Sequence, residues 1–192
     1  KLYKTRKAFT FMNYYKNLII RLSLITLMTL FYSYFYVILT PITLYISYFI
    51  IGLFYNVKII DDVLGVNGIG YRFIEACVAG AAYYLIFLLI LGVKDLELKK
   101  GMKLAILGFL LIFVMNILRI IILIVIGTEF GKNFFDSVHI LFWNFVSGVY
   151  VAVVWILLVY KFKIDKIPFY SDIKYFYSKS SLRKRFIYKK TQ

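Results

Sequence analysis

The chain has 192 residues, of which 62% are hydrophobic and 20% aromatic, and its formal net charge at pH 7 is +15. A soluble domain of this length is closer to half apolar, and a disordered chain is less hydrophobic still. A nucleic-acid-binding protein could carry this charge, but it could not expose so much apolar surface to water. We therefore expect an integral membrane protein that forms one domain.

Four apolar runs are each long enough to cross about 30 Å of hydrocarbon as a helix. In chain order they cover roughly residues 18–39, 76–93, 104–127 and 138–160. Pro41 is expected to end the first run, because proline interrupts the hydrogen bonds of a helix. The apolar stretch 41–55 is short for a span, so we expect it to form a short helix in the outer leaflet.

A polar segment at residues 57–74 separates this stretch from the second run. It contains Asn67-Gly68, a pair that strongly favours a two-residue turn between antiparallel strands. The sequence therefore predicts a small extracytoplasmic β-hairpin that leads directly into the second span. The expected fold is an all-α polytopic membrane protein with about four transmembrane helices, the short outer helix and this hairpin.

Basic residues are distributed very unevenly between the connecting segments. Residues 1–21, 94–103 and 161–190 hold 20 of the Lys and Arg residues, whereas 40–75 and 128–137 hold three. The positive-inside rule places both termini in the cytoplasm, which requires an even number of spans. We expect residues 1–160 to form a single transmembrane domain and residues 161–192 to form a basic cytoplasmic tail attracted to lipid headgroups.

Arg119 lies well inside the third run, where a charged side chain costs roughly 2.5–3.5 kcal/mol on insertion scales. Asn116 precedes it by three residues and so shares its face of the helix. Taken alone, an intramembrane Arg has either a structural pairing role or a functional role.

The single Cys and the single His are both expected at outer ends of spans. Cys77 opens the second span, where the positive helix N-terminus would favour a thiolate, and an ionised Glu75 would oppose this effect. His139 opens the fourth span, after Asp136 and Ser137, which we expect to be N-caps.

The inferred topology places Cys77, Arg119 and His139 in the outer half of the membrane, on three different spans. A nucleophile, an acid–base group and a cation are what thiol acyl transfer requires. With one Cys and one His, we expect no metal site. We also expect no cofactor.

Three blocks of the chain resemble the exosortase/archaeosortase family of membrane transpeptidases. They are Glu75-Ala76-Cys77-Val78-Ala79-Gly80, Asn116-Ile117-Leu118-Arg119 and His139 with Gly148. The His in the third block is similar to exosortases, and the short chain is similar to a compact core form. Family members often carry Ser or Thr and then a small residue after the Cys, where this chain has Val78 and Ala79.

The resemblance implies a cysteine transpeptidase or protease in a prokaryotic cell membrane. It would cleave a C-terminal sorting signal of secreted proteins at the outer face and pass them to an acceptor. Its substrates would end in a motif, an apolar span and a basic cluster. Cys77 would be the nucleophile, His139 the acid and base, Arg119 the oxyanion partner, and Asn116 would orient Arg119. The alternative is a transporter subunit or scaffold without enzymatic activity, in which Cys77 and His139 are incidental.

Overall fold

The structure is a computed structural model that describes residues 2–179, except for the side chains of 2–13, 75–76 and 179. It is mostly helical and contains one small antiparallel sheet, as the sequence predicts. Its elements in chain order are α1 (Leu2–Leu30), α2 (Tyr32–Ile51), β1 (Val57–Ile60), β2 (Val63–Val66), β3 (Ile69–Arg72), the 3-10 turn η1 (Glu75–Val78), α3 (Gly80–Gly92), α4 (Leu98–Phe130), α5 (Lys132–Leu141), the π-helical segment η2 (Phe142–Val146), α6 (Ser147–Phe162) and α7 (Tyr170–Lys179).

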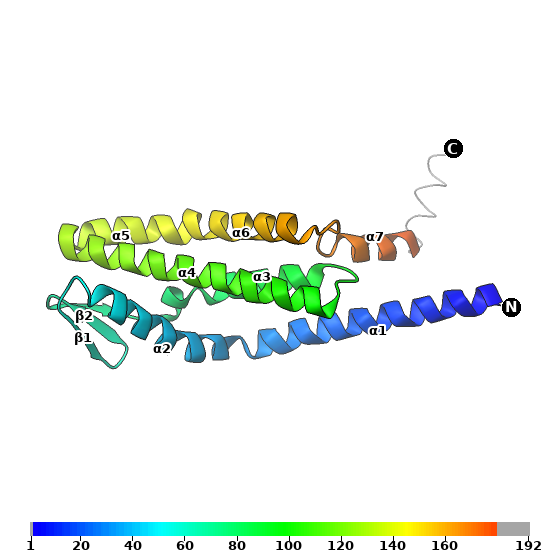
Figure 1. The fold of residues 1–192 in the computed structure, drawn as a ribbon, viewed down its shortest axis with the longest axis horizontal. Helices are drawn as coiled ribbons and strands as arrows, with labels where there is room; N and C mark the ends of the chain where they lie inside the picture. The colour runs from blue at the N-terminus through cyan, green and yellow to red at the C-terminus, as the bar shows by residue number, and fades with distance from the viewer. Residues whose placement is uncertain (1, 180–192) are drawn as a thin grey trace.

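The chain runs along the bundle four times. Figure 1 shows the sheet and the α4–α5 turn at one end, which we call the sheet end. The α3–α4 turn and α7 lie at the opposite end, the α7 end, beyond which α1 extends (Figure 1). Three helices in the described part of the chain are long and apolar enough to cross a membrane: Tyr32–Ile51, Leu98–Phe130 and the continuous helix Lys132–Phe162. The chain is therefore a candidate multi-pass membrane protein.

The first half of the chain differs from the sequence prediction in its helix boundaries. The helical break falls at Phe31, and Pro41 lies inside α2, so the expected span 18–39 and the separate outer helix 41–55 are both wrong. A proline is tolerated within an apolar helix when neighbouring groups satisfy the carbonyl that it leaves without a donor. Pro41 therefore does not end the helix in which it lies.

The second expected span is also shorter than the apolar run suggested. The helix α3 has 13 residues, which corresponds to about 20 Å. It begins only at Gly80 because Ala79 adopts a left-handed conformation, with φ of 55°, and separates η1 from α3. An α-helix cannot pass through a residue in that conformation.

The segment predicted as a hairpin contains three strands in the order β1-β2-β3. The predicted turn at Asn67-Gly68 is confirmed, with φ of 48° and 86° at the two residues. A second turn forms next to Asp61, whose φ is 55°. The sheet packs against the bundle, and this contact fully buries Leu64 and Val66 of the central strand. They pack in a cluster that includes residues of α2 and α4.

The main core lies between α3, α4 and α6. Ile86, Leu104 and Leu158 are almost completely buried there. Gly108 allows the helices to approach closely, since a Cβ atom at this position would lie 2.9 Å from Ile86 Cγ2 and 3.1 Å from Leu158 Cδ1. Small residues permit this kind of close helix packing in membranes. This core fixes α4 relative to α3, and α4 carries Arg119.

A polar cluster joins three segments at the α7 end. Arg21 Nη2 lies 2.6 Å from Asp172 Oδ2, and Arg21 Nε donates to the carbonyl of Leu91 at 2.6 Å. The hydroxyl of Tyr14 donates to Asp172 Oδ1 at 2.9 Å. Burial, followed by the contact with Asp172, raises the pKa of Tyr14 above its ordinary value. The described part of the basic C-terminal segment is thus folded against α1 and α3.

Candidate active site

Cys77 lies in η1, directly after the sheet, and its side chain is partly buried. The sequence predicted that it opens the second span, but η1 and the left-handed Ala79 place it before the first residue of α3. Cys77 thus lies two residues before Ala79, the N-cap of α3. The predicted effect of the helix N-terminus on its thiol stays a prediction.

Asn116 and Arg119 share the buried face of α4, as their spacing indicated. Their exposed fractions are 3% and 7%. Asn116 Nδ2 donates a hydrogen bond to the backbone carbonyl of Cys77 at 2.8 Å. Asn116 thus links η1 to α4 through the backbone of Cys77. The sequence predicted a different role for Asn116, the orientation of Arg119.

Arg119 is close enough to Cys77 for the two side chains to interact electrostatically. It interacts in the same way with Tyr83 of α3, which is 2% exposed. In a low-dielectric site a guanidinium stabilises a nearby anion much more strongly than it does in water. The position of Arg119 is thus suited to a negative charge that forms on or next to the Cys77 sulfur.

His139 lies in the last turn of α5, about two turns after the start of the continuous helix Lys132–Phe162. The helix begins at Lys132, so Asp136 and Ser137 are not N-caps, and the Ser137 hydroxyl donates to the Asn133 carbonyl at 2.9 Å. A cap at those positions was predicted because the apolar run begins there, whereas the helix starts one and a half turns earlier, after Gly131.

The imidazole of His139 stacks on the ring of Phe135, with 5.6 Å between centroids and 24° between planes. Phe135 in turn contacts Tyr71 of β3, at 5.8 Å between centroids. His139 itself is only partly buried. The aromatic contacts limit the positions that the imidazole can adopt.

A cavity of about 220 Å³ joins these residues at the sheet end of the bundle. Cys77 of η1, Arg119 of α4 and His139 of α5 all line it. The chain between Gly70 and Ile74 forms another side, and the remaining wall is apolar, made by Ile120, Leu123, Ile124 and Phe135. Three residues from separate parts of the sequence thus meet around a space large enough for part of a peptide.

Two other expectations about the site concern Glu75 and metal ions. Glu75 was predicted to influence the Cys77 thiol, but its side chain lies outside the described residues. Within the described residues, no three side chains of His, Cys, Asp or Glu are grouped so that they could hold a metal ion.

Tyr71 is a residue of this site that the sequence reasoning missed. Its hydroxyl lies 3.0 Å from Thr128 Oγ1 and donates to the Ile124 carbonyl at 3.4 Å, so β3 is anchored to α4. Gly127 makes room for this hydroxyl, because a Cβ atom there would lie 2.6 Å from it. A glycine beside a polar Thr near the end of an apolar run was the available signal for this close approach.

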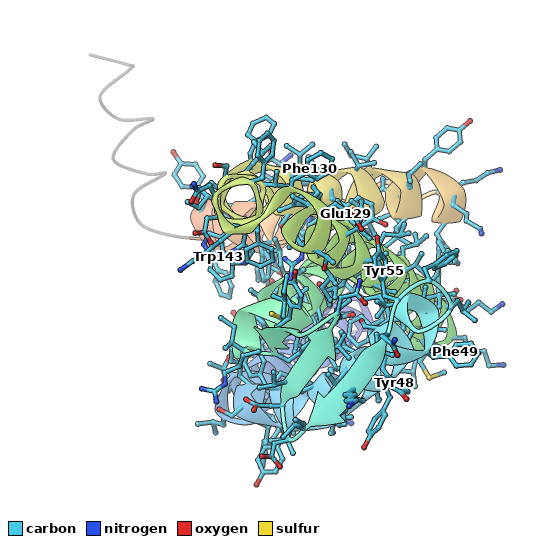
Figure 2. All side chains as sticks on the ribbon, turned by 90° about the vertical axis from the view of Figure 1, so that its left-hand side faces the viewer. Tyr48, Phe49, Tyr55, Glu129, Phe130 and Trp143 are labelled. Carbon is cyan, nitrogen blue, oxygen red and sulfur yellow. The ribbon has the colours of Figure 1, made fainter. Side chains whose placement is uncertain are left out.

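Aromatic side chains surround the sheet end. Figure 2 looks onto the sheet end and shows Phe49, Phe130 and Trp143 on the outside of the bundle, and all three are more than half exposed. The hydroxyl of Tyr55 donates to Glu129 Oε1 at 2.9 Å, and this hydrogen bond raises the pKa of Tyr55. Aromatic residues are enriched at membrane–water interfaces. Their positions are those expected if the cavity lies near such an interface.

No protein-family model matches this chain, and no curated protein or solved structure matches it either.

Proposed function

We propose that this chain is a membrane-embedded cysteine transpeptidase or protease that acts on the C-terminal sorting signals of secreted proteins. The observation that carries the proposal is the shared cavity of Cys77, Arg119 and His139. These are the only Cys, the only His and a buried Arg, and they come from three separate elements. If each of the three residues had only a separate structural role, nothing would require them to line the same cavity.

The chemistry follows from the roles available to each group. The Cys77 thiolate attacks the carbonyl carbon of the scissile peptide bond, and Arg119 stabilises the oxyanion that forms. The tetrahedral intermediate collapses to a thioester as the C–N bond breaks, and His139 donates a proton to the leaving amine. His139 then accepts a proton from the incoming nucleophile, which attacks the thioester and releases Cys77. Water as the nucleophile gives hydrolysis, and an amine or hydroxyl acceptor gives transfer.

The arrangement of charge supports a site on the outer face of a prokaryotic cytoplasmic membrane. The α3–α4 turn and the segment after α6, at the α7 end, are rich in Lys, whereas the sheet-end segments hold only Lys58, Arg72 and Lys132. The positive-inside rule assigns the α7 end and both termini to the cytoplasm. A secreted client held in the membrane by a C-terminal apolar span would then present its cleavage motif beside the cavity. Membrane lipids surround the bundle and are its other partners.

The experiment uses mass spectrometry to compare the C-termini of secreted proteins between cells with the wild-type chain and cells with a variant. Cys77→Ala and His139→Gln should leave clients with an intact apolar span, while both variants still insert in the membrane. Asp136→Asn is the matched control, because Asp136 is exposed and lies about one turn before His139. It should process clients normally.

The same comparison separates an enzyme from a transporter subunit or scaffold. If Cys77→Ala cells show the same secreted C-termini as wild-type cells, Cys77 is not a nucleophile and the scaffold is the better description. Cleavage that persists without Cys77 but disappears with the whole chain removed would point to an indirect role.

A further inference from the structure

Strand β3 is an edge strand of the small sheet, which has the order β1-β2-β3. The opposite edge, β1, packs against α2, and its Val57 and Ile59 are partly buried against the core. By contrast, Ile69, Gly70 and Arg72 of β3 are exposed. An exposed edge presents unpaired backbone donors and acceptors that another extended chain can bond.

The register shows which backbone groups of β3 are available. Tyr71 pairs with Leu64, and Phe73 N–H donates to the Asp62 carbonyl at 2.8 Å. In an antiparallel ladder, alternate residues direct both backbone groups to the same neighbour. Since Phe73, Tyr71 and Ile69 face β2, the N–H and C=O groups of Gly70 and Arg72 point away from the sheet.

This free edge borders the cavity that contains the three candidate catalytic residues. Gly70 and Arg72 line the same space as Cys77, Arg119 and His139. Gly70 has no side chain, so an incoming backbone meets little obstruction there. The edge is therefore continuous with the site at which a bound peptide would react.

We propose that an extended peptide, the segment of a client that precedes its membrane span, binds by adding to β3 as a fourth strand. Its backbone pairs with the N–H and C=O groups of Gly70 and Arg72, which directs the following carbonyl toward Cys77. This is the strand-addition mode of peptide recognition, in which main-chain bonds supply affinity and pockets supply specificity. The apolar wall at Ile120, Leu123 and Phe135 then selects apolar client side chains.

The catalytic consequence rests on the proposed function, but strand addition itself does not need a reactive Cys77. The test therefore measures binding in membranes that contain the full chain, in both wild-type and Cys77→Ala forms. The probe is a pool of eight-residue peptides of randomised sequence with a central diazirine residue. A matched pool carries a methyl group on every backbone amide, which removes the strand donors on both edges of the peptide while keeping the same side chains. Cross-links are mapped by mass spectrometry.

Arg72→Pro and Arg72→Ala form the matched pair of variants. Both remove the Arg72 side chain and its exposed contact with Asp62 at 3.5 Å, but only proline also removes the outward N–H. Because that N–H takes no part in the β2–β3 ladder, the sheet tolerates proline at this edge position. Membrane insertion and protein level of the two variants are compared first.

The unmethylated pool should cross-link to β3 and the cavity wall at least about tenfold more than the methylated pool, since two or more backbone bonds are lost by methylation. Arg72→Pro should lower the yield roughly fivefold, and Arg72→Ala should retain it. Equal yields from the two pools, or equal yields from Arg72→Pro and Arg72→Ala, would overturn strand addition. If cross-linking behaves as expected while Cys77→Ala cells still process their secreted proteins, the proposed catalysis fails and the docking site stands.

Discussion

Asn116 holds the backbone next to the candidate nucleophile, because its Nδ2 donates to the Cys77 carbonyl at 2.8 Å. The two residues lie 39 positions apart in the sequence and come from α4 and η1. Since Asn116 is 3% exposed, water cannot easily replace the bond. The position of Cys77 relative to α4 therefore depends on this amide.

Replacing Asn116 with Ala should destabilise the protein by about 1–3 kcal/mol, because the Cys77 carbonyl loses its donor in a buried setting. Thermal unfolding in detergent micelles measures the change. Val114→Ala is the control, since Val114 is about half exposed on the same helix. An Asn116→Ala midpoint equal to that of Val114→Ala would show that the hydrogen bond contributes little.

Arg119→Ala should lower the rate of client processing by about 10²–10³, the loss seen when an oxyanion donor is removed from a protease. Arg119→Lys should fall between this variant and the wild type, because Lys keeps the charge but not the planar donor fork. The rate of appearance of the new client C-terminus measures both. Leu118→Ala, at an exposed neighbouring position, should process normally. Processing by Arg119→Ala within twofold of the wild-type rate would exclude the proposed role.

Asp172→Ala should destabilise the protein by about 3–5 kcal/mol, because the substitution leaves the charge of Arg21 buried without its partner. The two side chains are only 15% and 8% exposed. Asp95→Ala is a matched control, because the Asp95–Lys166 pair spans 3.0 Å but is about half exposed and should contribute about 1 kcal/mol or less. Chemical unfolding measures both variants, and similar losses for the two would contradict a buried pair.

The contact between Tyr14 and Asp172 should make stability depend on pH in the alkaline range. Burial and the hydrogen bond raise the pKa of Tyr14 in the folded protein, so folding favours the protonated phenol. The contribution is complete below the ordinary tyrosine pKa of about 10 and is lost as the pH rises above it. The measurement is the stability difference between wild type and Tyr14→Phe at pH 8 and pH 11. That difference should shrink at pH 11, and a constant or growing difference would contradict the assignment.

The orientation of the bundle can be tested with single cysteines in a Cys77→Ala background. Lys58→Cys lies at the exposed surface of β1, and Lys166→Cys lies in the exposed segment after α6. A membrane-impermeant maleimide should label Lys58→Cys in intact cells and Lys166→Cys only after permeabilisation. Labelling of Lys166→Cys in intact cells would reverse the proposed topology.

Local patterns accounted well for features that depend on a few neighbouring residues. The turn at Asn67-Gly68 was predictable because those two residues readily adopt positive φ. The shared burial of Asn116 and Arg119 followed from helical periodicity. The extra strand, the position of the break at Phe31 and the retention of Pro41 inside α2 were not predictable in this way. They depend on how each segment packs against others.

The sequence by itself determined the apolar runs, the division of charge between two ends and the choice of the only Cys, the only His and a buried Arg as candidates. These properties depend only on composition and on neighbouring residues. The bilayer constrains them directly, because it requires apolar spans and an asymmetric distribution of Lys and Arg. Only the tertiary structure decided that Cys77 lies in its own 3-10 turn, that Asn116 holds its carbonyl and that β3 borders the cavity. Each of these depends on contacts between residues far apart in the chain, and the periodicity of a single segment carries no information about its distant partners. The proximity of Arg21 and Asp172, 151 residues apart, has the same origin.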